Sequence, residues 1–204
     1  MYGYPASTYV QTVRLVCEEK QIAYELQEVD FSDPSYIVLH PFLKMPTLRD
    51  GNFTLYESFA ISVYLDEAYP GLPLQPRDVR LKGRMFQWMS AINSYFYEPM
   101  VRHCIQERFL KPTMGIAPDE ATIRGAMPII ESQLRLVDAE MKDHQFLIND
   151  DLTLADLFLG PISIYLLKTP EGGQCIPQFP NLERWLRDLS RRETFQMVCS
   201  ISPL

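Results

Sequence analysis

A segment with three prolines in seven residues constrains this chain of 204 residues more than any other feature. Proline cannot continue the interior of a helix and removes a hydrogen-bond donor from a sheet, so Pro70 to Pro76 must end whatever precedes it. Extended and helical patterns mix before this segment, whereas long helical patterns follow it. We therefore predict an α/β domain over residues 1–72, a linker over residues 73–77 and an all-α domain over residues 78–204.

The first domain opens with the pattern of a strand, a turn and a helix. Residues 2–4 have the character of a short strand end, and a turn follows around Pro5. Apolar residues at helical spacing then predict a helix over residues 8–20. Side chains alternate over residues 23–29, which predicts a second strand.

A hairpin is predicted in the middle of the first domain. The Asp50-Gly51 pair lies between two extended runs, and Asp-Gly in this setting is a strong hairpin signal. It predicts antiparallel strands over residues 46–49 and 53–56. A helix should then begin at Glu57 or Ser58 and end before the proline segment.

The second domain has the patterns of helices alone. Its clearest helix start combines Thr153 with Asp156 three residues later, where the carboxylate can reach back to the N–H of the capping residue. The predicted helices cover residues 79–109, 121–141, 154–167 and 182–192.

The charge balance and the cysteines argue against several classes of protein. The chain has 19 Lys plus Arg against 26 Asp plus Glu, and the basic residues are scattered, so we expect no nucleic-acid partner. The 4 cysteines show no metal-ligand spacing and no Gly-rich phosphate loop occurs, so we expect reduced thiols, no metal and no nucleotide. No apolar run approaches the ~20 residues that span a bilayer, and no secretory signal is evident. We therefore expect no membrane partner and a cytoplasmic location.

Four short segments in this order resemble the cytosolic glutathione S-transferases. They are Tyr4-Pro5-Ala6-Ser7, Met45-Pro46-Thr47-Leu48, Glu57-Ser58 and Thr153-x-x-Asp156. The resemblance covers nearly the whole chain and implies a thioredoxin-like α/β domain followed by an all-α helical bundle. The local match is to the serine-type members, in particular to bacterial enzymes similar to the phi and theta classes.

The resemblance assigns the catalytic role to Ser7, and Arg14 matches an arginine on the same helix. A hydroxyl at a helix N-terminus stabilises a thiolate by a hydrogen bond and by the helix dipole. The tyrosine of other classes would stand at Gly3 rather than Tyr4, and Cys17 is too far along the helix for a cysteine mechanism. The alternative is that Ser7 only caps the helix.

The resemblance also implies a glutathione site. Met45 would pair its backbone with the cysteinyl unit beside a cis Pro46, and Lys44 could reach the glycine carboxylate. Glu57 would take the γ-glutamyl ammonium, while Ser58 and the helix N-terminus would take the carboxylate. A trans proline, a solvated lysine and an ordinary helix cap are the alternatives. His40 is not assigned to the ligand.

A second pocket should hold a small apolar electrophile, between the first turn and the first long helix of the second domain. Each residue proposed for its lining could equally belong to the core. The candidates are Tyr9, Tyr95, Met100, His103, Cys104 and Tyr165.

The resemblance implies a glutathione transferase with glutathione as co-substrate. Glutathione-dependent isomerisation, dehalogenation or peroxide reduction would use the same activated thiol, and a non-catalytic glutathione-binding or protein-interaction module is also possible on this fold. A two-fold homodimer is expected. Its candidate contacts are Phe53, Tyr64, Met85 and Trp88.

Overall fold

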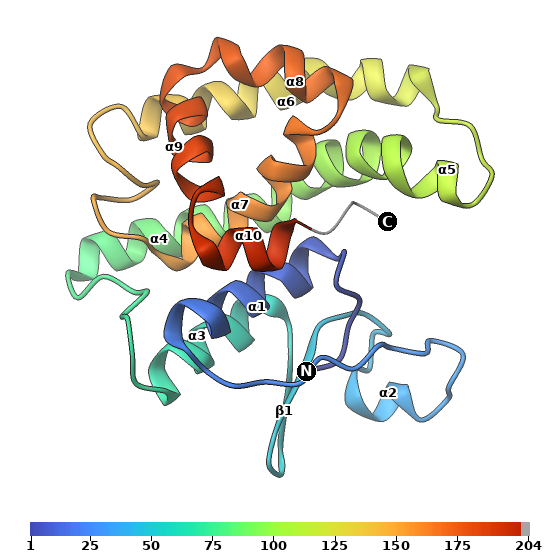
Figure 1. The fold of residues 1–204 in the computed structure, drawn as a ribbon, viewed down its shortest axis with the longest axis vertical. Coiled ribbons are helices and arrows are strands. Elements are labelled where there is room, and N and C mark those ends of the chain that lie inside the picture. The colour runs from blue at the N-terminus through green and yellow to red at the C-terminus, as the bar shows by residue number, and fades with distance from the viewer. Residues whose placement is uncertain (201–204) are drawn as a thin grey trace.

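A computed structural model describes residues 1–200. It has a layer of helices above a smaller region that contains the sheet, and α1 lies between the two (Figure 1). The smaller region is formed by α1 (Thr8–Lys20), α2 (Tyr36–Leu39), β1 (Thr47–Asp50), β2 (Phe53–Tyr56) and α3 (Ser58–Ala68).

The hairpin and the two long helices of this region confirm their predictions. β1 pairs antiparallel with β2, from Thr47 opposite Tyr56 to Asp50 opposite Phe53, with Gly51 in the turn at φ 57°. The positive φ explains the glycine, because residues with a Cβ rarely adopt it. α3 begins at Ser58 and ends before the proline segment.

The predicted strand over residues 23–29 is wrong as a regular strand. This segment pairs with the N-terminus through a single parallel bridge between Tyr2 and Gln27, and Tyr2 bridges Thr47 on its other side. The hydrogen bonds have ordinary lengths, since Gly3 N–H donates to Gln27 O at 2.9 Å and Tyr2 N–H donates to Thr47 O at 2.8 Å. Only three N-terminal residues take part, which is too few for a continuous ladder. The spatial order is nevertheless that of a thioredoxin-like sheet, with residues 1–3 in the middle.

The helical region follows the predicted order but adds short helices near the C-terminus. The predicted helix over residues 79–109 is helical but changes at Ile92 into a π-helix, whose i→i+5 bonds include Lys111 N–H to Gln106 O. The elements are α4 (Val79–Ala91), the π-helix η1 (Ile92–Leu110), α5 (Lys111–Thr113), α6 (Glu120–Glu140), α7 (Leu154–Leu167), α8 (Pro170–Cys175), the 3₁₀ helix η2 (Ile176–Gln178), α9 (Pro180–Ser190) and α10 (Glu193–Cys199).

The start of α7 is built around a fully buried carboxylate. Asp156 Oδ2 accepts from Thr153 N–H at 2.9 Å and from the Thr153 hydroxyl at 2.8 Å. Its Oδ1 accepts from Leu147 N–H at 2.8 Å and from Trp185 Nε1–H at 2.9 Å. The predicted reach of Asp156 back to the cap is confirmed, and the same side chain also joins α7 to α9. Burial raises the pKa of Asp156, against the lowering effect of these donors.

α1 connects the two regions. The Thr12 hydroxyl donates to Leu157 O on α7 at 3.2 Å. At the other end of α1, Glu19 accepts from Arg192 Nη2 at 2.6 Å and from the Thr194 hydroxyl at 2.5 Å. α1, which Ser7 precedes as the N-terminal capping residue, is therefore part of the smaller region and is also hydrogen-bonded to the helical region.

The proline segment is also held on both sides. Lys20 and Asp66 form a buried ion pair at 3.0 Å, and Lys20 Nζ also donates to Leu72 O at 3.3 Å. Leu74 N–H donates to Asp66 Oδ1 at 3.0 Å, while Leu74 O accepts from Leu154 N–H at 2.9 Å. The segment is thus fixed to α3 and to α7 at one residue.

Two predicted groups of residues can be located directly. All 4 cysteines are free and buried, as expected for reduced thiols. Of the proposed dimer contacts, Phe53 is exposed and its ring lies 5.1 Å from that of Tyr64, and Trp88 is half-buried. Met85 is fully buried, so its proposed contact with a second chain is wrong. Among the described residues, no helix has the length and apolar character needed to cross a bilayer.

Candidate functional site

Two adjoining cavities meet at Ser7, where α1 begins. The first is polar, has a volume of about 640 Å³, and lies between the α/β region and η1. The second is mainly apolar and has a volume of about 410 Å³. Ser7, Met45 and Tyr97 line both cavities, so a molecule in one can contact a molecule in the other at these residues.

Ser7 is the N-terminal capping residue of α1, yet its side chain makes no capping hydrogen bond. Its backbone is held at both ends, because Ser7 N–H donates to Tyr4 O at 3.0 Å and Ser7 O accepts from Gln11 N–H at 2.8 Å. The hydroxyl therefore stands at the positive end of the helix dipole without a role in capping. This is the arrangement that stabilises an anion.

The other candidate nucleophile activators are engaged or excluded. The Tyr4 hydroxyl donates to Val29 O. A Cβ at Gly3 would lie 2.4 Å from Val10 Cγ2, so a tyrosine there would force the buried Val10 side chain to move. Burial raises the pKa of the Cys17 thiol to about 12, which keeps it protonated.

The segment before β1 forms one wall of both cavities. The Met45–Pro46 peptide is cis, as expected. Met45 Sδ accepts from Tyr4 N–H at 3.2 Å, and the Tyr36 hydroxyl donates to Lys44 O at 2.7 Å. The backbone of this segment is therefore fixed, while the Lys44 side chain remains exposed at the polar cavity.

Glu57 and Ser58 lie at the N-terminus of α3 and line the polar cavity. Glu57 has φ 71° and ψ 115°, a strained conformation for a residue with a side chain. Such strain is stored where the surrounding structure requires a fixed backbone direction. Ser58 is buried, and the N–H groups of the first turn of α3 provide an anion site beside it.

His40 also lines the polar cavity, although sequence reasoning left it unassigned. The ring is buried, its Nδ1 accepts from Phe42 N–H at 3.4 Å, and it lies 4.9 Å from the Tyr56 ring. Burial lowers the pKa of His40, so the neutral ring offers an Nε2–H donor. The available signal was its position before Pro41, within the same loop as Lys44.

The helical region contributes aromatic and charged groups to the polar cavity. Tyr9 of α1 stacks on Tyr97 of η1 with their centroids 4.6 Å apart, and Arg102 lies over the Tyr97 ring at 5.7 Å. Arg102 Nε pairs with Glu98 at 3.2 Å. Burial raises the pKa of Tyr9, so its phenol stays protonated. Tyr9 thus belongs to the polar cavity rather than to the apolar one, where it was predicted.

One face of η1 forms one wall of the apolar cavity, and Tyr165 of α7 also lines this cavity. Tyr165 is the one predicted electrophile-pocket residue that lines it. Residues spaced by four and five along η1 share this face because i→i+5 bonding widens each turn. The wall residues that sequence reasoning missed are Val101, Ile105, Gln106, Phe109 and Leu110, with Tyr97 at the boundary between the cavities.

The remaining predicted pocket residues do not line the apolar cavity. Met100 and Cys104 are fully buried in the core on the other side of η1. Tyr95 is 69% exposed, and His103 pairs with Glu98 at 3.3 Å on the surface.

Arg14, which matches the helix arginine of the family, lines neither cavity. Its Nε donates to the Tyr24 hydroxyl at 3.0 Å. On α1, Thr8 lines the apolar cavity, and Gln11 contacts Tyr165 in its wall. Gln11 Nε2 donates to Pro5 O at 3.1 Å and to the Tyr165 hydroxyl at 2.6 Å.

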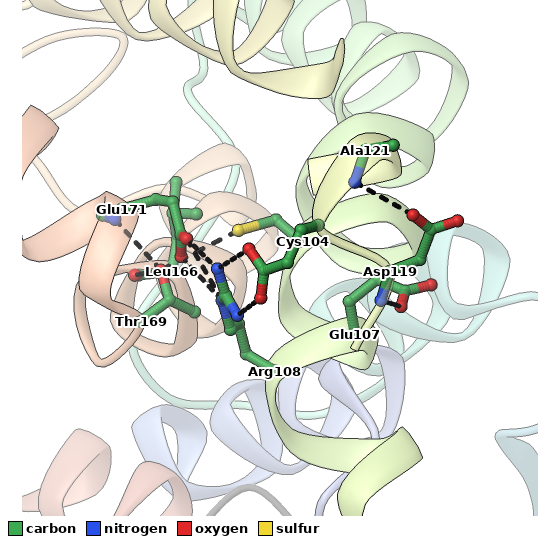
Figure 2. A network of polar contacts seen from close by, with 10 residues as sticks. Cys104, Glu107, Arg108, Asp119, Ala121, Leu166, Thr169 and Glu171 are labelled. Atoms are coloured by element: carbon green, nitrogen blue, oxygen red, sulfur yellow. Dashed lines mark hydrogen bonds and ion pairs between the residues drawn. The ribbon is translucent and has the colours of Figure 1, made fainter. Parts of the chain in front are cut away.

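An ionic network joins η1 to α6 and α8. Figure 2 shows Arg108 reaching from η1 to Glu171 of α8, with Cys104 and Thr169 beside it. Arg108 Nε lies 3.1 Å from both oxygens of Glu171, and Arg108 Nη1 lies 2.6 Å from Glu120 of α6. These hydrogen bonds from Arg108 lower the pKa of Glu171 and of Glu120. The network fixes the helix whose other face forms the apolar wall.

Metal ligation finds no support at this site. Within residues 1–200, no three His, Cys, Asp or Glu side chains are grouped closely enough to hold a metal ion.

A thioredoxin-like region followed by a helical region, with a hydroxyl at the first helix N-terminus between two cavities, defines a class of glutathione-dependent enzymes. The profile described as glutathione S-transferase, C-terminal domain, matches residues 89–193, which is more than half of the chain. The profile of the N-terminal domain matches residues 1–76. The chain belongs to the glutathione S-transferase family.

Individual relatives match this chain over most of their length. The chain is 29% identical to glutathione S-transferase 1 of Triticum aestivum, with 100% of this chain and 94% of that protein covered. It is 28% identical to a glutathione S-transferase of Hyoscyamus muticus, with 94% and 93% covered. These relatives are plant enzymes, and glutathione transfer is the activity that they support.

Solved structures show the same fold. Glutathione S-transferase III in its apo form superposes with a TM-score of 0.90 at 28% identity, covering 100% of this chain and 96% of that chain. The theta class enzyme of Xanthomonas axonopodis pv. citri, solved with glutathione bound, has a TM-score of 0.88 at 26% identity and covers 100% and 97%.

Proposed function

We propose that this glutathione transferase is a serine-type enzyme, in which Ser7 stabilises the glutathione thiolate. The observation that carries the proposal is the position of Ser7. It lines both cavities, it begins α1, and its hydroxyl makes no capping bond. A hydroxyl hydrogen bond and the helix dipole together favour the thiolate over the thiol, whose unperturbed pKa is about 8.5.

Glutathione would occupy the polar cavity, with its charged ends at the charged walls. Glu57 would bind the γ-glutamyl ammonium, and Ser58 with the first amides of α3 would bind the adjacent carboxylate. The Met45 backbone would pair with the cysteinyl unit, and Lys44 would approach the glycine carboxylate. The neutral His40 ring supplies a further donor to the same cavity.

A small apolar electrophile would occupy the second cavity, beside the sulfur. The thiolate attacks the electrophilic carbon, a C–S bond forms, and the leaving group departs with the electrons of its bond, or a double bond accepts the pair. Holding both reactants at Ser7 makes the step effectively unimolecular. The apolar wall of η1 excludes water, which strengthens the hydrogen bond at the thiolate.

The test is calorimetric titration with glutathione, followed by thiolate absorbance against pH in the same sample. We expect binding with a thiol pKa below that of free glutathione. Ser7→Ala should raise the bound thiol pKa and lower kcat by about 10- to 100-fold, with a smaller change in glutathione affinity.

Ser190→Ala is the matched control, because Ser190 is exposed at the end of α9. Unchanged turnover in Ser7→Ala would refute the role of Ser7. Binding without turnover over a panel of electrophiles would favour a non-catalytic glutathione-binding module. Absence of binding in the unmodified protein would refute the glutathione site itself.

We also propose a two-fold homodimer in the cytoplasm, as the family resemblance implies. The exposed Phe53, beside Tyr64 on α3, and the half-buried Trp88 are the contacts proposed for it. Light scattering measures the assembly, and a monomeric mass would contradict it. Phe53→Asp should weaken the dimer, because it places a charge in an apolar contact.

A further inference from the structure

The turn that precedes α1 is fixed by a buried amide. Residues Tyr4 to Ser7 form a β-turn, closed by the bond from Ser7 N–H to Tyr4 O at 3.0 Å. Pro5 and Ala6 are its two central residues. Gln11, one helical turn further along α1, donates from Nε2 to Pro5 O at 3.1 Å and from its backbone N–H to Ser7 O at 2.8 Å. The segment that presents Ser7 is therefore bound at two points to one residue.

The bond to Pro5 O controls the orientation of this turn. β-turns of types I and II differ mainly by a rotation of the peptide between the two central residues. Here that peptide joins Pro5 to Ala6, and the oxygen that swings when it rotates is Pro5 O. A donor on this oxygen holds the peptide in one orientation, and with it the direction in which the chain enters Ser7.

A second partner holds the amide of Gln11. Its Nε2 also donates to the Tyr165 hydroxyl of α7 at 2.6 Å. Pro5 O can only accept, so the atom bonded to it is the amide nitrogen, whose two hydrogens are then both used. Gln11 is fully buried and Tyr165 is 2% exposed, so water does not compete for these bonds. The amide thus connects the turn before Ser7 to a helix of the other region.

We propose that Gln11 is a positioning residue for Ser7, which holds the turn so that the Ser7 hydroxyl points at the glutathione sulfur. The inference rests on the proposed function, in which that hydroxyl stabilises the thiolate. The Ser7 hydroxyl makes no capping bond, so its placement depends on the backbone that carries it. Gln11 lines neither cavity, so it acts only through this backbone.

The next residue of α1 provides a comparison, because it joins α1 to α7 in another way. The Thr12 hydroxyl is buried and lies 3.2 Å from Leu157 O of α7 and 3.1 Å from Thr8 O. Within residues 1–200 it makes no hydrogen bond to the turn before Ser7. Thr12 therefore separates the effect of a link to α7 from the effect of the bond to Pro5 O.

The test measures the thiol pKa of bound glutathione in the full-length protein, by thiolate absorbance against pH and without an electrophile. Gln11→Met keeps the length of the side chain and removes both amide bonds. We expect it to raise the pKa of the bound thiol, and to lower the thiolate fraction at neutral pH about two- to five-fold. In acid, where the bound thiol is protonated in both proteins, the Kd for glutathione should agree within about two-fold.

Two further proteins show whether Gln11 acts through Ser7. Thr12→Val is the matched control, since it removes a buried link to α7 and should leave the bound thiol pKa unchanged. In a Ser7→Ala background, Gln11→Met should cause no further rise, because the hydroxyl that it positions is absent. An equal rise with and without the Ser7 hydroxyl would overturn the proposal, and so would an unchanged pKa in Gln11→Met.

Tyr165→Phe answers the same question if Gln11→Met does not fold. It leaves the amide in place but removes one of its two anchors, so the bound thiol pKa should still rise, and an unchanged pKa would then overturn the proposal. Failure of the proposed function gives a different result. In that case the unmodified protein binds glutathione without lowering its thiol pKa, or Ser7→Ala leaves that pKa unchanged.

Discussion

The polar and apolar cavities share Ser7 but are built in different ways. The polar cavity takes its charged groups from loops and from the N-terminus of α3, at Lys44, Glu57 and Ser58. The apolar cavity takes its wall from one continuous face of η1. The first site thus depends on short segments with special backbone geometry, whereas the second depends on how a long helix is rotated in its packing. Substitutions should therefore affect the two sites separately, except where both are supported together.

Asp156→Ala should have the largest effect and remove both sites together. It leaves four buried donors without their acceptor at the start of α7, which carries Tyr165 and contacts α1. We expect a loss of about 3–5 kcal/mol in the free energy of unfolding, measured by urea denaturation. Asp151→Ala, at an exposed neighbouring position, is the control. A folded, stable Asp156→Ala protein that lost only one activity would contradict this shared support.

Glu57→Gly should affect the polar cavity alone. It removes the carboxylate proposed for the glutathione ammonium, and we expect the Kd for glutathione to rise about ten-fold or more. Glycine also relieves the strained φ of 71°, so stability should stay level or rise by up to about 1 kcal/mol. Calorimetry and thermal unfolding measure the two effects. Glu67→Ala, exposed on α3, serves as the comparison, and a fall in stability with binding intact would refute the assignment.

Phe109→Ala should affect the apolar cavity alone. Loss of the ring removes apolar area from the electrophile wall, and we expect KM for an apolar electrophile to rise about five- to ten-fold. The Kd for glutathione should not change. Steady-state kinetics at saturating glutathione measure the effect, with Met114→Ala as an exposed control just beyond α5. Weaker glutathione binding in this variant would show that the two cavities are not separable.

Arg108→Met should have the smallest effect, and one that depends on pH. Hydrogen bonds from Arg108 lower the pKa of Glu171, so their stabilisation is present above the unfolded value near 4.5 and is lost as the pH falls through the lower folded value. We expect a loss of about 1–2 kcal/mol at neutral pH, which shrinks in acid below that value. Thermal unfolding across pH measures it. A difference that is constant from neutral to acid pH would show that the ion pairs contribute little.

Part of the lining of the polar cavity could be predicted from the sequence, because the local structure that carries it is set over short distances. An Asp-Gly pair selects its own turn, and the Thr153–Asp156 spacing selects a helix start, whatever packs around them. Glu57 and Ser58 follow directly from the hairpin before them. His40 was missed because nothing local indicates that its loop turns back toward the cavity.

The apolar wall could not be predicted in the same way. Met100 and Cys104 have the composition of a pocket lining, yet both are buried in the core, while Val101 and Ile105 line the cavity. Pro99 lies inside η1, where it cannot donate the i→i−4 hydrogen bond of an α-helix, and η1 packs against α6 and α7. The prediction of a regular strand over residues 23–29 was wrong because alternation of side chains within a segment does not show how many residues the neighbouring strand supplies for pairing.

The bonds at Leu74 determine how such an enzyme can acquire new substrates. One residue accepts from Leu154 and donates to Asp66, so the two regions cannot swing relative to each other without breaking a buried contact. The fixed packing of the two regions consequently determines the distance between the sulfur and the electrophile. Diversification must then proceed by exchanging side chains along the wall of η1 and leave the reaction distance untouched. The packing of the two regions is then constant, and the side chains along η1 determine which electrophile is accepted.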